Sequence, residues 1–200
     1  MKVGVLASGA GTNLQAILDR VHGCEGVEVV AVASDKPGAE ALVRAGRAGV
    51  ATAEFPLGAD RAVRDEAIAD FLSERGVELV VLAGYMALLS PGFLARFPGR
   101  VINVHPALLP AFAGIGAVEQ AIAYGVKVFG VTVHFVDEGV DTGPIILQRA
   151  IDLPAATEAQ EVRAALRPIE HELLCEAVRL IARDAVRIDP SNPRRVLIAS

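Results

Sequence analysis

The sequence contains no tryptophan, and aromatic residues fill only 4% of its 200 positions. The core must therefore consist mainly of Val, Leu, Ile and Ala, since hydrophobic residues nevertheless reach 52%. With 22% charged residues, this composition excludes an intrinsically disordered chain. A chain of this length corresponds to one domain, or to two small halves that share a core.

Cysteines and long apolar runs are also scarce. Cys24 and Cys175 lie far apart without metal-binding spacing, so we interpret them as reduced thiols of a cytoplasmic protein and expect no metal. The two long stretches without charged residues, 79–95 and 101–118, are interrupted by proline, so no segment reaches the ~20 apolar residues of a membrane span. Residues 3–7 are too few for the apolar region of a signal peptide.

Basic residues are also fewer than acidic residues. The 19 Lys and Arg residues are outnumbered by 24 Asp and Glu residues, which gives a formal net charge of −5. This balance disfavours nucleic acid and anionic membranes as partners. We therefore expect small molecules as partners, and the sequence leaves open a monomer or a homodimer.

Short apolar segments alternate with segments of helical periodicity along most of the chain. Strands are expected at 3–7, 27–33, 51–55, 79–83, 101–105, 128–136 and 144–150. Helices are expected at 14–21, 39–48, 62–75, 91–97 and 118–124. This alternation predicts an α/β fold with an open, mostly parallel, twisted sheet of about seven strands flanked by helices. The last two strands have no helix between them, so we expect a hairpin-like pair at one edge.

The C-terminal part is predicted to be a long helix followed by an irregular tail. Residues 157–160 read Thr-Glu-Ala-Gln and match a capping box, and apolar residues follow at helical spacing up to Leu180. Pro168 should kink this helix or restart it. Residues 186–200 contain Pro190 and Pro193, and we interpret them as irregular.

Residues 8–13, Ser-Gly-Ala-Gly-Thr-Asn, form a small-residue turn between the first strand and the first helix. Backbone N–H groups at such a helix N-terminus bind anions. The turn lacks the third glycine of a dinucleotide fingerprint and the lysine of a P-loop. It therefore favours a phosphate monoester, and a tight turn without a ligand is an equal alternative.

Asn103 and His105 end the fifth expected strand, and the period of two places them on the same face. Pro106 and Pro110 stiffen the loop that follows. A polar pair that opens into such a loop is a poor way to build a core, because buried Asn and His need partners. The pair therefore indicates a catalytic site, and a structural histidine bonded to backbone is the alternative.

Residues 137–144, Asp-Glu-Gly-Val-Asp-Thr-Gly-Pro, form an acidic loop between the last two strands. Asp141 lies at a sharp turn between two glycines, where its carboxylate can face a histidine at a strand end. Such a partner would raise the pKa of the histidine and orient its ring. A solvated hairpin tip explains this loop equally well when it is taken alone.

Four blocks of the sequence, in order, resemble the glycinamide ribonucleotide formyltransferases of purine biosynthesis. The blocks are residues 8–17, 82–86, 103–110 and 132–145. The resemblance extends from Val3 to Leu180 and implies a formyltransferase-type Rossmann-like fold. It also implies transfer of the formyl group of 10-formyltetrahydrofolate, as co-substrate, to the amine of 5'-phosphoribosylglycinamide (GAR), in IMP biosynthesis.

The resemblance also implies the roles of individual residues. Asn103 and protonated His105 would stabilise the oxyanion, and Asp141 would support His105 and proton transfer. The GAR-binding residues implied in this way are Gly11, Thr12, Asn13 and Glu170. The folate-binding residues implied in this way are Arg61, Met86, Ala87, Leu88, Leu89, Asn103, Asp137, Glu138, Gly139, Val140 and Asp141. Residues 1–100 would then bind the nucleotide phosphate, and residues 101–185 would bind folate and carry out catalysis, within a single domain that spans residues 1–200.

Some positions depart from the family pattern, and other functions remain as alternatives. Ala87 stands where many relatives have Arg, and Gly116 and Val118 stand where relatives often have His. Methionyl-tRNA formyltransferases need a further C-terminal domain and a basic surface, and we expect this chain to have neither the length nor the charge for them. The alternatives are a formyltetrahydrofolate deformylase-like hydrolase, which carries an additional N-terminal domain, and a non-catalytic phosphate-sugar binding module.

Overall fold

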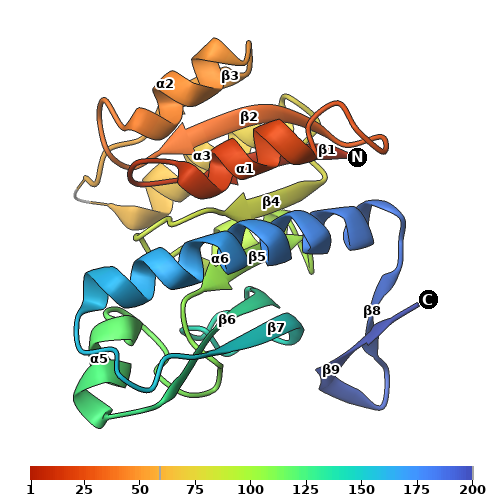
Figure 1. The fold of residues 1–200 in the computed structure, drawn as a ribbon. Coiled ribbons are helices and arrows are strands. Elements are labelled where there is room, and N and C mark those ends of the chain that lie inside the picture. Colours follow the sequence, from red (N-terminus) through yellow and green to blue (C-terminus); the bar gives the residue numbers. More distant parts are fainter. Residues whose placement is uncertain (59, 200) are drawn as a thin grey trace. The chain divides into compact units, whose positions relative to one another are not determined.

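The computed structural model describes residues 1–58 and 60–199, and it divides into two compact units, Met1–Asn103 and Val104–Ser200. Strands and helices alternate through most of the chain, and most adjacent strands of the first unit run parallel, which confirms the expected α/β fold (Figure 1). These described residues form nine strands rather than about seven. None of their helices is both long and apolar enough to cross a bilayer.

The first unit is built on a parallel sheet with the strand order β3-β2-β1-β4-β5. Its strands are β1 (Lys2–Leu6), β2 (Glu28–Ser34), β3 (Ala51–Glu54), β4 (Leu79–Leu82) and β5 (Val101–His105). Its helices are α1 (Thr12–Arg20), α2 (Glu40–Arg47), α3 (Arg61–Ser73) and α4 (Pro91–Arg96). Strands β1 and β4 are almost fully buried, as expected for parallel strands covered on both faces.

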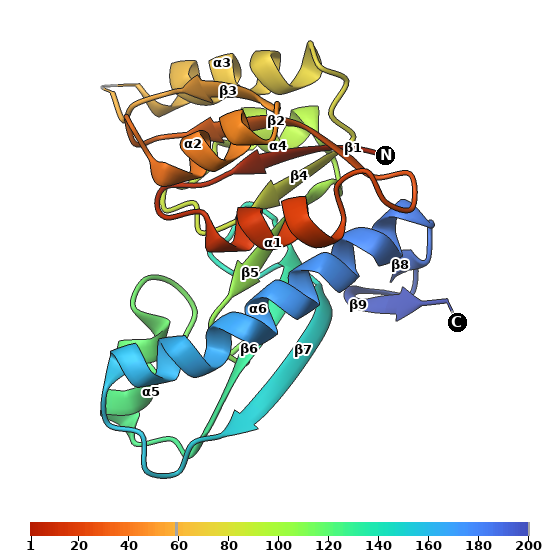
Figure 2. The ribbon, with the colours of Figure 1, turned by 45° about the horizontal axis from the view of Figure 1, so that its top comes forward.

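The strand order reverses direction at β1, and this reversal positions the first candidate site. The chain moves outward from β1 to β2 and β3, and then returns to β4 on the other side of β1. Right-handed crossovers therefore place helices on both faces, and Figure 2 shows α1 and α3 on opposite faces. The loops after β1 and β4 are joined where the Ser8 N–H donates to the Gly84 carbonyl at 3.1 Å. Ligands of open α/β sheets bind at this kind of switch point.

The second unit combines a long helix with antiparallel hairpins. Its elements are α5 (Ala117–Tyr124), β6 (Val128–Phe135), β7 (Ile145–Asp152), α6 (Ala159–Ala182), β8 (Val186–Asp189) and β9 (Asn192–Ile198). Strands β6 and β7 pair antiparallel, which confirms the hairpin-like pair expected from the sequence. Helix α6 buries Val162, Leu166 and Leu173 and packs against β6 and β7.

Three expectations for the C-terminal part were wrong. Residues 186–198 are not irregular, because β8 and β9 form an antiparallel hairpin. Pro190 lies in its turn, and Pro193 lies in β9 where the pairing register with β8 shifts, a position that tolerates a missing N–H. Ser200 lies outside the described residues. Helix α6 continues through Pro168, so the expected restart is wrong, whereas the expected kink stays a prediction. The capping box does not form, because α6 begins after Glu158, without a side-chain cap.

Candidate active site

The second unit brings His105 and Asp141 together. His105 is the last residue of β5, and Asp141 lies in the loop between β6 and β7. The Nδ1 atom of His105 lies 3.3 Å from Oδ2 of Asp141, and their side chains are only 6% and 14% exposed. Two groups that the sequence separates by a whole helix and a strand therefore form a buried pair, as the sequence predicts.

A second histidine contacts the other oxygen of the same carboxylate. The Nε2 atom of His134 in β6 lies 3.5 Å from Oδ1 of Asp141. Its ring is fixed from the opposite side, where Nδ1 lies 2.8 Å from the carbonyl oxygen of Phe135. The backbone N–H of Gly114 donates a further hydrogen bond of 2.8 Å to Oδ2 of Asp141. Asp141 therefore has partners on both carboxylate oxygens.

The loop that carries Asp141 requires its glycines for steric reasons. A Cβ atom at Gly143 would lie 1.8 Å from the carbonyl oxygen of Phe135, and one at Gly139 would lie 2.0 Å from Oγ1 of Thr142. Asp137 braces the loop from within, because its Oδ1 accepts hydrogen bonds from the Gly139 N–H at 3.1 Å and the Thr142 hydroxyl at 2.5 Å. These contacts leave Asp141 as the carboxylate that faces the histidines.

The surroundings of Asp141 favour its ionised form. Burial raises the pKa of this carboxyl group, but hydrogen bonds from His134 and Gly114 and the charges of His105 and His134 outweigh burial. The pKa of Asp141 falls from 3.8 to about 2 as a result. The group is therefore a carboxylate throughout the neutral range and can act as a fixed negative charge beside two imidazoles.

Acceptor oxygens surround both ring nitrogens of His105. Nδ1 faces Asp141, and Nε2 lies 2.9 Å from the carbonyl oxygen of Phe112. A neutral imidazole carries one N–H and can satisfy only one of these acceptors, whereas the imidazolium satisfies both. The geometry therefore suits a His105 ring that donates through Nε2 to an oxygen acceptor.

The loop after His105 is held in place by Thr132 of β6. The Thr132 hydroxyl donates to the Ala107 carbonyl at 2.7 Å and accepts a hydrogen bond from the Leu109 N–H at 3.1 Å. The Gln148 side chain of β7 donates to the Leu109 carbonyl at 2.8 Å. The peptide bond between Leu109 and Pro110, which the sequence left open, is cis. The buried Thr132 and the Gln148 side chain thus fix the start of the loop that reaches Phe112 and Gly114.

Asn103 and Glu170 occupy the elements expected for them. Asn103 is half-buried and precedes His105 by two residues in β5, so the two side chains share one strand face. Glu170 is half-buried in the middle of α6. The next carboxylate of the helix, Glu172, pairs with Arg149 of β7 at 2.5 Å. The roles of Asn103 and Glu170 toward a substrate stay predictions.

In the first unit, residues 8–13 form a tight turn before α1. Gly11 adopts a left-handed φ of 70° at the N-cap, where a Cβ atom would lie 2.7 Å from Cα of Ala41. The Ala41 N–H donates to the Gly9 carbonyl at 3.1 Å, and the Arg44 side chain donates to the Ala10 carbonyl at 2.8 Å. Thr12 and Asn13 then open the helix. The turn is suited to an anion, because helix N-terminal N–H groups face outward from it.

The segment Met86–Leu89 begins directly beside this turn. The backbone N–H of Met86 donates to Oγ of Ser8 at 2.8 Å. The side chains of Met86 and Leu88 are 64% and 57% exposed. The Leu88 carbonyl accepts a hydrogen bond from Arg64, whose guanidinium also pairs with the buried Asp65 at 2.7 Å. The segment that carries these exposed apolar side chains is therefore bound through its backbone to a buried ion pair.

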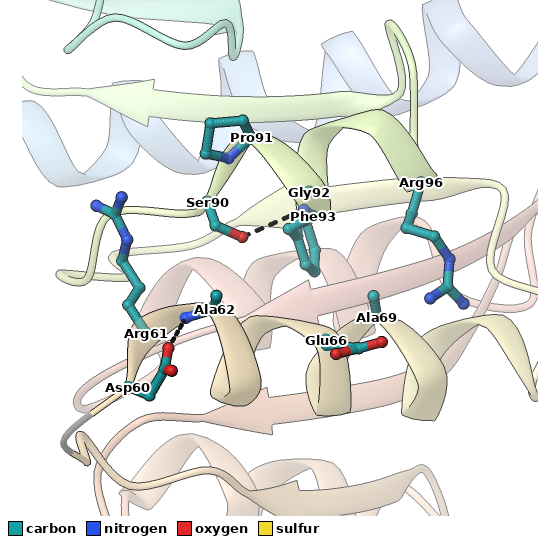
Figure 3. A pocket seen from close by; sticks show the side chains of 10 residues that line it. All are labelled: Asp60, Arg61, Ala62, Glu66, Ala69, Ser90, Pro91, Gly92, Phe93 and Arg96. Atoms are coloured by element: carbon teal, nitrogen blue, oxygen red, sulfur yellow. Dashed lines mark hydrogen bonds between the residues drawn. The ribbon is translucent and has the colours of Figure 1, made fainter.

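Arg61 lies in a different part of the first unit. It lines a pocket of about 600 Å³ between α3 and α4, and Figure 3 shows Arg61 and Arg96 at opposite ends of this pocket with Glu66 between them. The residues that line this pocket do not include the segment Met86–Leu89. The expected place of Arg61 near a folate therefore stays a prediction without support from this pocket.

Sequence reasoning missed a role for His134 and for the N–H of Gly114. His134 belongs to a strongly apolar strand, which favoured a core position, yet its alternation with Thr132 placed two polar side chains on one face of β6. The backbone N–H of Gly114 carries no sequence signal. Within residues 1–58 and 60–199, no three His, Cys, Asp or Glu side chains are arranged to hold a metal ion.

Comparisons with known proteins agree with this geometry. Residues 1–178 match the Formyl transferase family. A phosphoribosylglycinamide formyltransferase of Haemophilus influenzae is 39% identical over 190 residues, which cover 94% of this chain and 90% of that protein. The matched residues therefore include most of each unit.

Solved structures give the same result. Glycinamide ribonucleotide transformylase 1 from Symbiobacterium toebii matches with a TM-score of 0.93 and 45% identity, over 100% of this chain and 94% of that chain. A formyltetrahydrofolate deformylase from Pseudomonas syringae matches with a TM-score of 0.91 but only 25% identity, and this chain covers 66% of it. Sequence identity and coverage therefore both favour the transformylase over the deformylase.

Proposed function

The chain belongs to the phosphoribosylglycinamide formyltransferase family of de novo purine biosynthesis, and we propose that Asn103, His105 and Asp141 catalyse its reaction. In that reaction the primary amine of GAR takes the formyl group from N10 of 10-formyltetrahydrofolate. The products are formyl-GAR and tetrahydrofolate. The observation that carries the assignment of roles is the buried pair of His105 and Asp141 at the end of β5.

His105 and Asn103 stabilise the charge that develops on the formyl oxygen. Attack of the amine on the formyl carbon converts the carbonyl oxygen into an oxyanion, which two donors on one strand face can bind. The carbonyl oxygen of Phe112, 2.9 Å from Nε2 of His105, shows where an acceptor oxygen fits. We propose that the formyl oxygen replaces it. Removal of one such donor costs about 3–4 kcal/mol of transition-state stabilisation.

Asp141 supports His105 and assists the proton transfer from the attacking amine. Its carboxylate is ionised at neutral pH, because its pKa is held at about 2. This carboxylate lies 3.3 Å from Nδ1 of His105 and orients the ring. The amine loses a proton as the new C–N bond forms, and the nitrogen of the folate gains one as it leaves. A fixed carboxylate beside the reacting groups can pass this proton, through water where needed.

The substrate contacts follow the family resemblance and the local structure. Backbone N–H groups of Gly11, Thr12 and Asn13 bind the GAR phosphate at the start of α1, and Glu170 binds the glycinamide part. The exposed apolar side chains of Met86 and Leu88 suit a flat aromatic ring. By the family resemblance we assign folate contacts to the segment 86–89 and to Arg61 in the first unit, and to the loop 137–141 in the second. Cys24 and Cys175 are free thiols, which fits a cytoplasmic location.

A coupled assay tests this proposal against its two alternatives. The protein is incubated with 10-formyltetrahydrofolate and GAR, and each compound is omitted in turn while tetrahydrofolate is measured. We expect tetrahydrofolate only when both compounds are present. Release of tetrahydrofolate without GAR would instead support a deformylase-like hydrolase. Absence of product from every mixture would support a phosphate-sugar binding module without catalytic activity.

A further inference from the structure

The C-terminal hairpin contacts the residue that follows Asp141. Arg194 lies in β9, and its Nη1 donates a hydrogen bond to the carbonyl oxygen of Thr142. Strand β9 also pairs in parallel with β7, where Ile145 is opposite Arg195. The hairpin of β8 and β9 therefore meets the loop between β6 and β7 at its second half. Arg194 contacts this loop from a neighbouring strand, whereas Asp137 forms hydrogen bonds within the loop itself.

The hairpin is itself held firmly at its turn. Oδ1 of Asp189 accepts hydrogen bonds from the Ser191 N–H at 2.8 Å and the Ser191 hydroxyl at 2.7 Å. Oδ2 of Asp189 accepts from Nε of Arg195 at 2.7 Å. The Arg194 N–H donates to Oδ1 of Asn192 at 3.0 Å. The backbone of Arg194 is thus fixed before its side chain reaches Thr142.

Asp141 needs such support more than an ordinary loop residue does. Its φ of 53° lies in the left-handed region, which non-glycine residues occupy at a cost unless the surroundings hold them there. The peptide that joins Asp141 to Thr142 carries the carbonyl of Asp141, and the next peptide carries the carbonyl that Arg194 binds. A guanidinium bond to that carbonyl is charge-assisted and strong. It limits rotation of the chain immediately after the strained residue.

We propose that Arg194 is a positioning residue for the formyl transfer, which holds the Asp141–Thr142 backbone so that the Asp141 carboxylate faces His105. Arg194 acts through Asp141 and does not touch the reacting atoms. The inference rests on the proposed catalytic role of Asp141. It gives the C-terminal hairpin, which pairs with β7 at one edge, a function in catalysis.

The test compares two hairpin arginines that differ in this one contact. Arg194→Met removes the guanidinium and keeps an unbranched apolar side chain, and Arg194→Lys keeps a cationic donor. Arg187→Met is the matched control. Arg187 is an exposed residue of β8, and its substitution removes the same charge from the same hairpin. Each variant is measured for kcat, for KM with GAR and for its melting temperature.

We expect Arg194→Met to lower kcat about 10-fold, because small misplacements of a catalytic group reduce rates by one to two orders of magnitude. KM for GAR should stay within about twofold and the melting temperature within a few degrees, a split that loss of folded protein would not produce. Arg194→Lys should recover most of kcat, and Arg187→Met should match the parent protein. An unchanged kcat in Arg194→Met, or equal losses in Arg194→Met and Arg187→Met, would overturn the inference.

Asp141→Asn, measured in the same series, separates this inference from the proposed function. If Asp141→Asn loses most turnover while Arg194→Met keeps the parent kcat, the role of Arg194 is wrong and that of Asp141 stands. If Asp141→Asn keeps the parent kcat, the proposed role of Asp141 is wrong, and the inference about Arg194 falls with it. If Arg194→Met does not fold, Arg194→Ala is measured in its place, and a kcat of Arg194→Ala equal to that of Arg187→Met would overturn the inference.

Discussion

His134 and Asp141 form a contact of 3.5 Å between Nε2 and Oδ1, on the carboxylate oxygen opposite the one that faces His105. Two buried imidazoles therefore share one carboxylate. Among the groups that lower the pKa of Asp141, the hydrogen bond from His134 has the largest effect. Replacing His134 should consequently change the titration of Asp141 even though His105 remains.

The variant His134→Leu should raise the pKa of Asp141 above its value of about 2. The physical reason is that burial raises this pKa, and the variant removes the strongest opposing contact. The measurement is a ¹³C NMR titration of the carboxyl groups, in which the exposed Asp152 of β7 serves as internal reference. An unchanged titration of Asp141 would show that His134 does not interact with it.

Stability at acid pH should depend on Asp141. Its pKa is lower in the folded chain, at about 2, than its ordinary 3.8. A depressed folded pKa stabilises the fold above the ordinary pKa, and this contribution disappears as pH falls from about 4 to about 2. The free energy of unfolding of Asp141→Asn should therefore decrease less steeply across this window, as measured by urea unfolding at each pH. Identical slopes for the variant and the parent protein would contradict the depressed pKa.

The turn before α1 should tolerate a side chain at Gly9 but not at Gly11. Gly11→Ala places a Cβ atom 2.7 Å from Cα of Ala41 at a left-handed φ, whereas nothing lies within 4 Å of a Cβ atom at Gly9. We expect Gly11→Ala to destabilise the protein by roughly 1–3 kcal/mol. Thermal unfolding of the two variants tests this difference. Equal melting temperatures would mean that the turn is not closed against α2.

The ion pair under the segment Met86–Leu89 should matter more than a surface pair of the same helix. Asp65 is fully buried and binds Arg64 and the Ser90 N–H, whereas Asp70 pairs with Arg96 while 58% exposed. Asp65→Ala should cost about 3–5 kcal/mol in the free energy of unfolding, because it leaves a buried guanidinium unpaired. Asp70→Ala should cost about 0–1 kcal/mol. Denaturant unfolding measures both, and similar losses would contradict the burial of the first pair.

Most strands could be predicted because their signal is local. Apolar runs such as Leu79–Leu82 are buried on both faces, and the sequence pattern alone indicates this. The hairpin of β8 and β9 could not be predicted, since its strands are mostly exposed, the apolar alternation of β8 covers only four residues, and Pro190 and Pro193 are residues that usually interrupt strands. Its order depends on side chains such as Asp189, whose contacts with Ser191 and Arg195 form only in the fold.

The candidate site likewise contains some contacts that the sequence could predict and others that it could not. The pair of His105 and Asp141 could be predicted because His105 ends β5 and Asp141 lies in the loop that follows β6, and loops at strand ends gather functional groups. His134 was overlooked because a histidine inside an apolar strand resembles a core residue until its distance to Asp141 is known. The Gly114 N–H and the Arg194 contact depend on backbone positions, which no single residue type indicates.

The turnover of Asp141→Asn is the most direct test of the catalytic account. Asp152→Asn is the control, since this exposed carboxylate at the end of β7 belongs to no part of the site. With saturating GAR and 10-formyltetrahydrofolate, Asp141→Asn should lose at least about 100-fold in kcat, as loss of proton transfer predicts. GAR should still bind to it by calorimetry, and Asp152→Asn should retain the parent kcat. Formyl transfer by Asp141→Asn at a rate near that of Asp152→Asn would contradict the account.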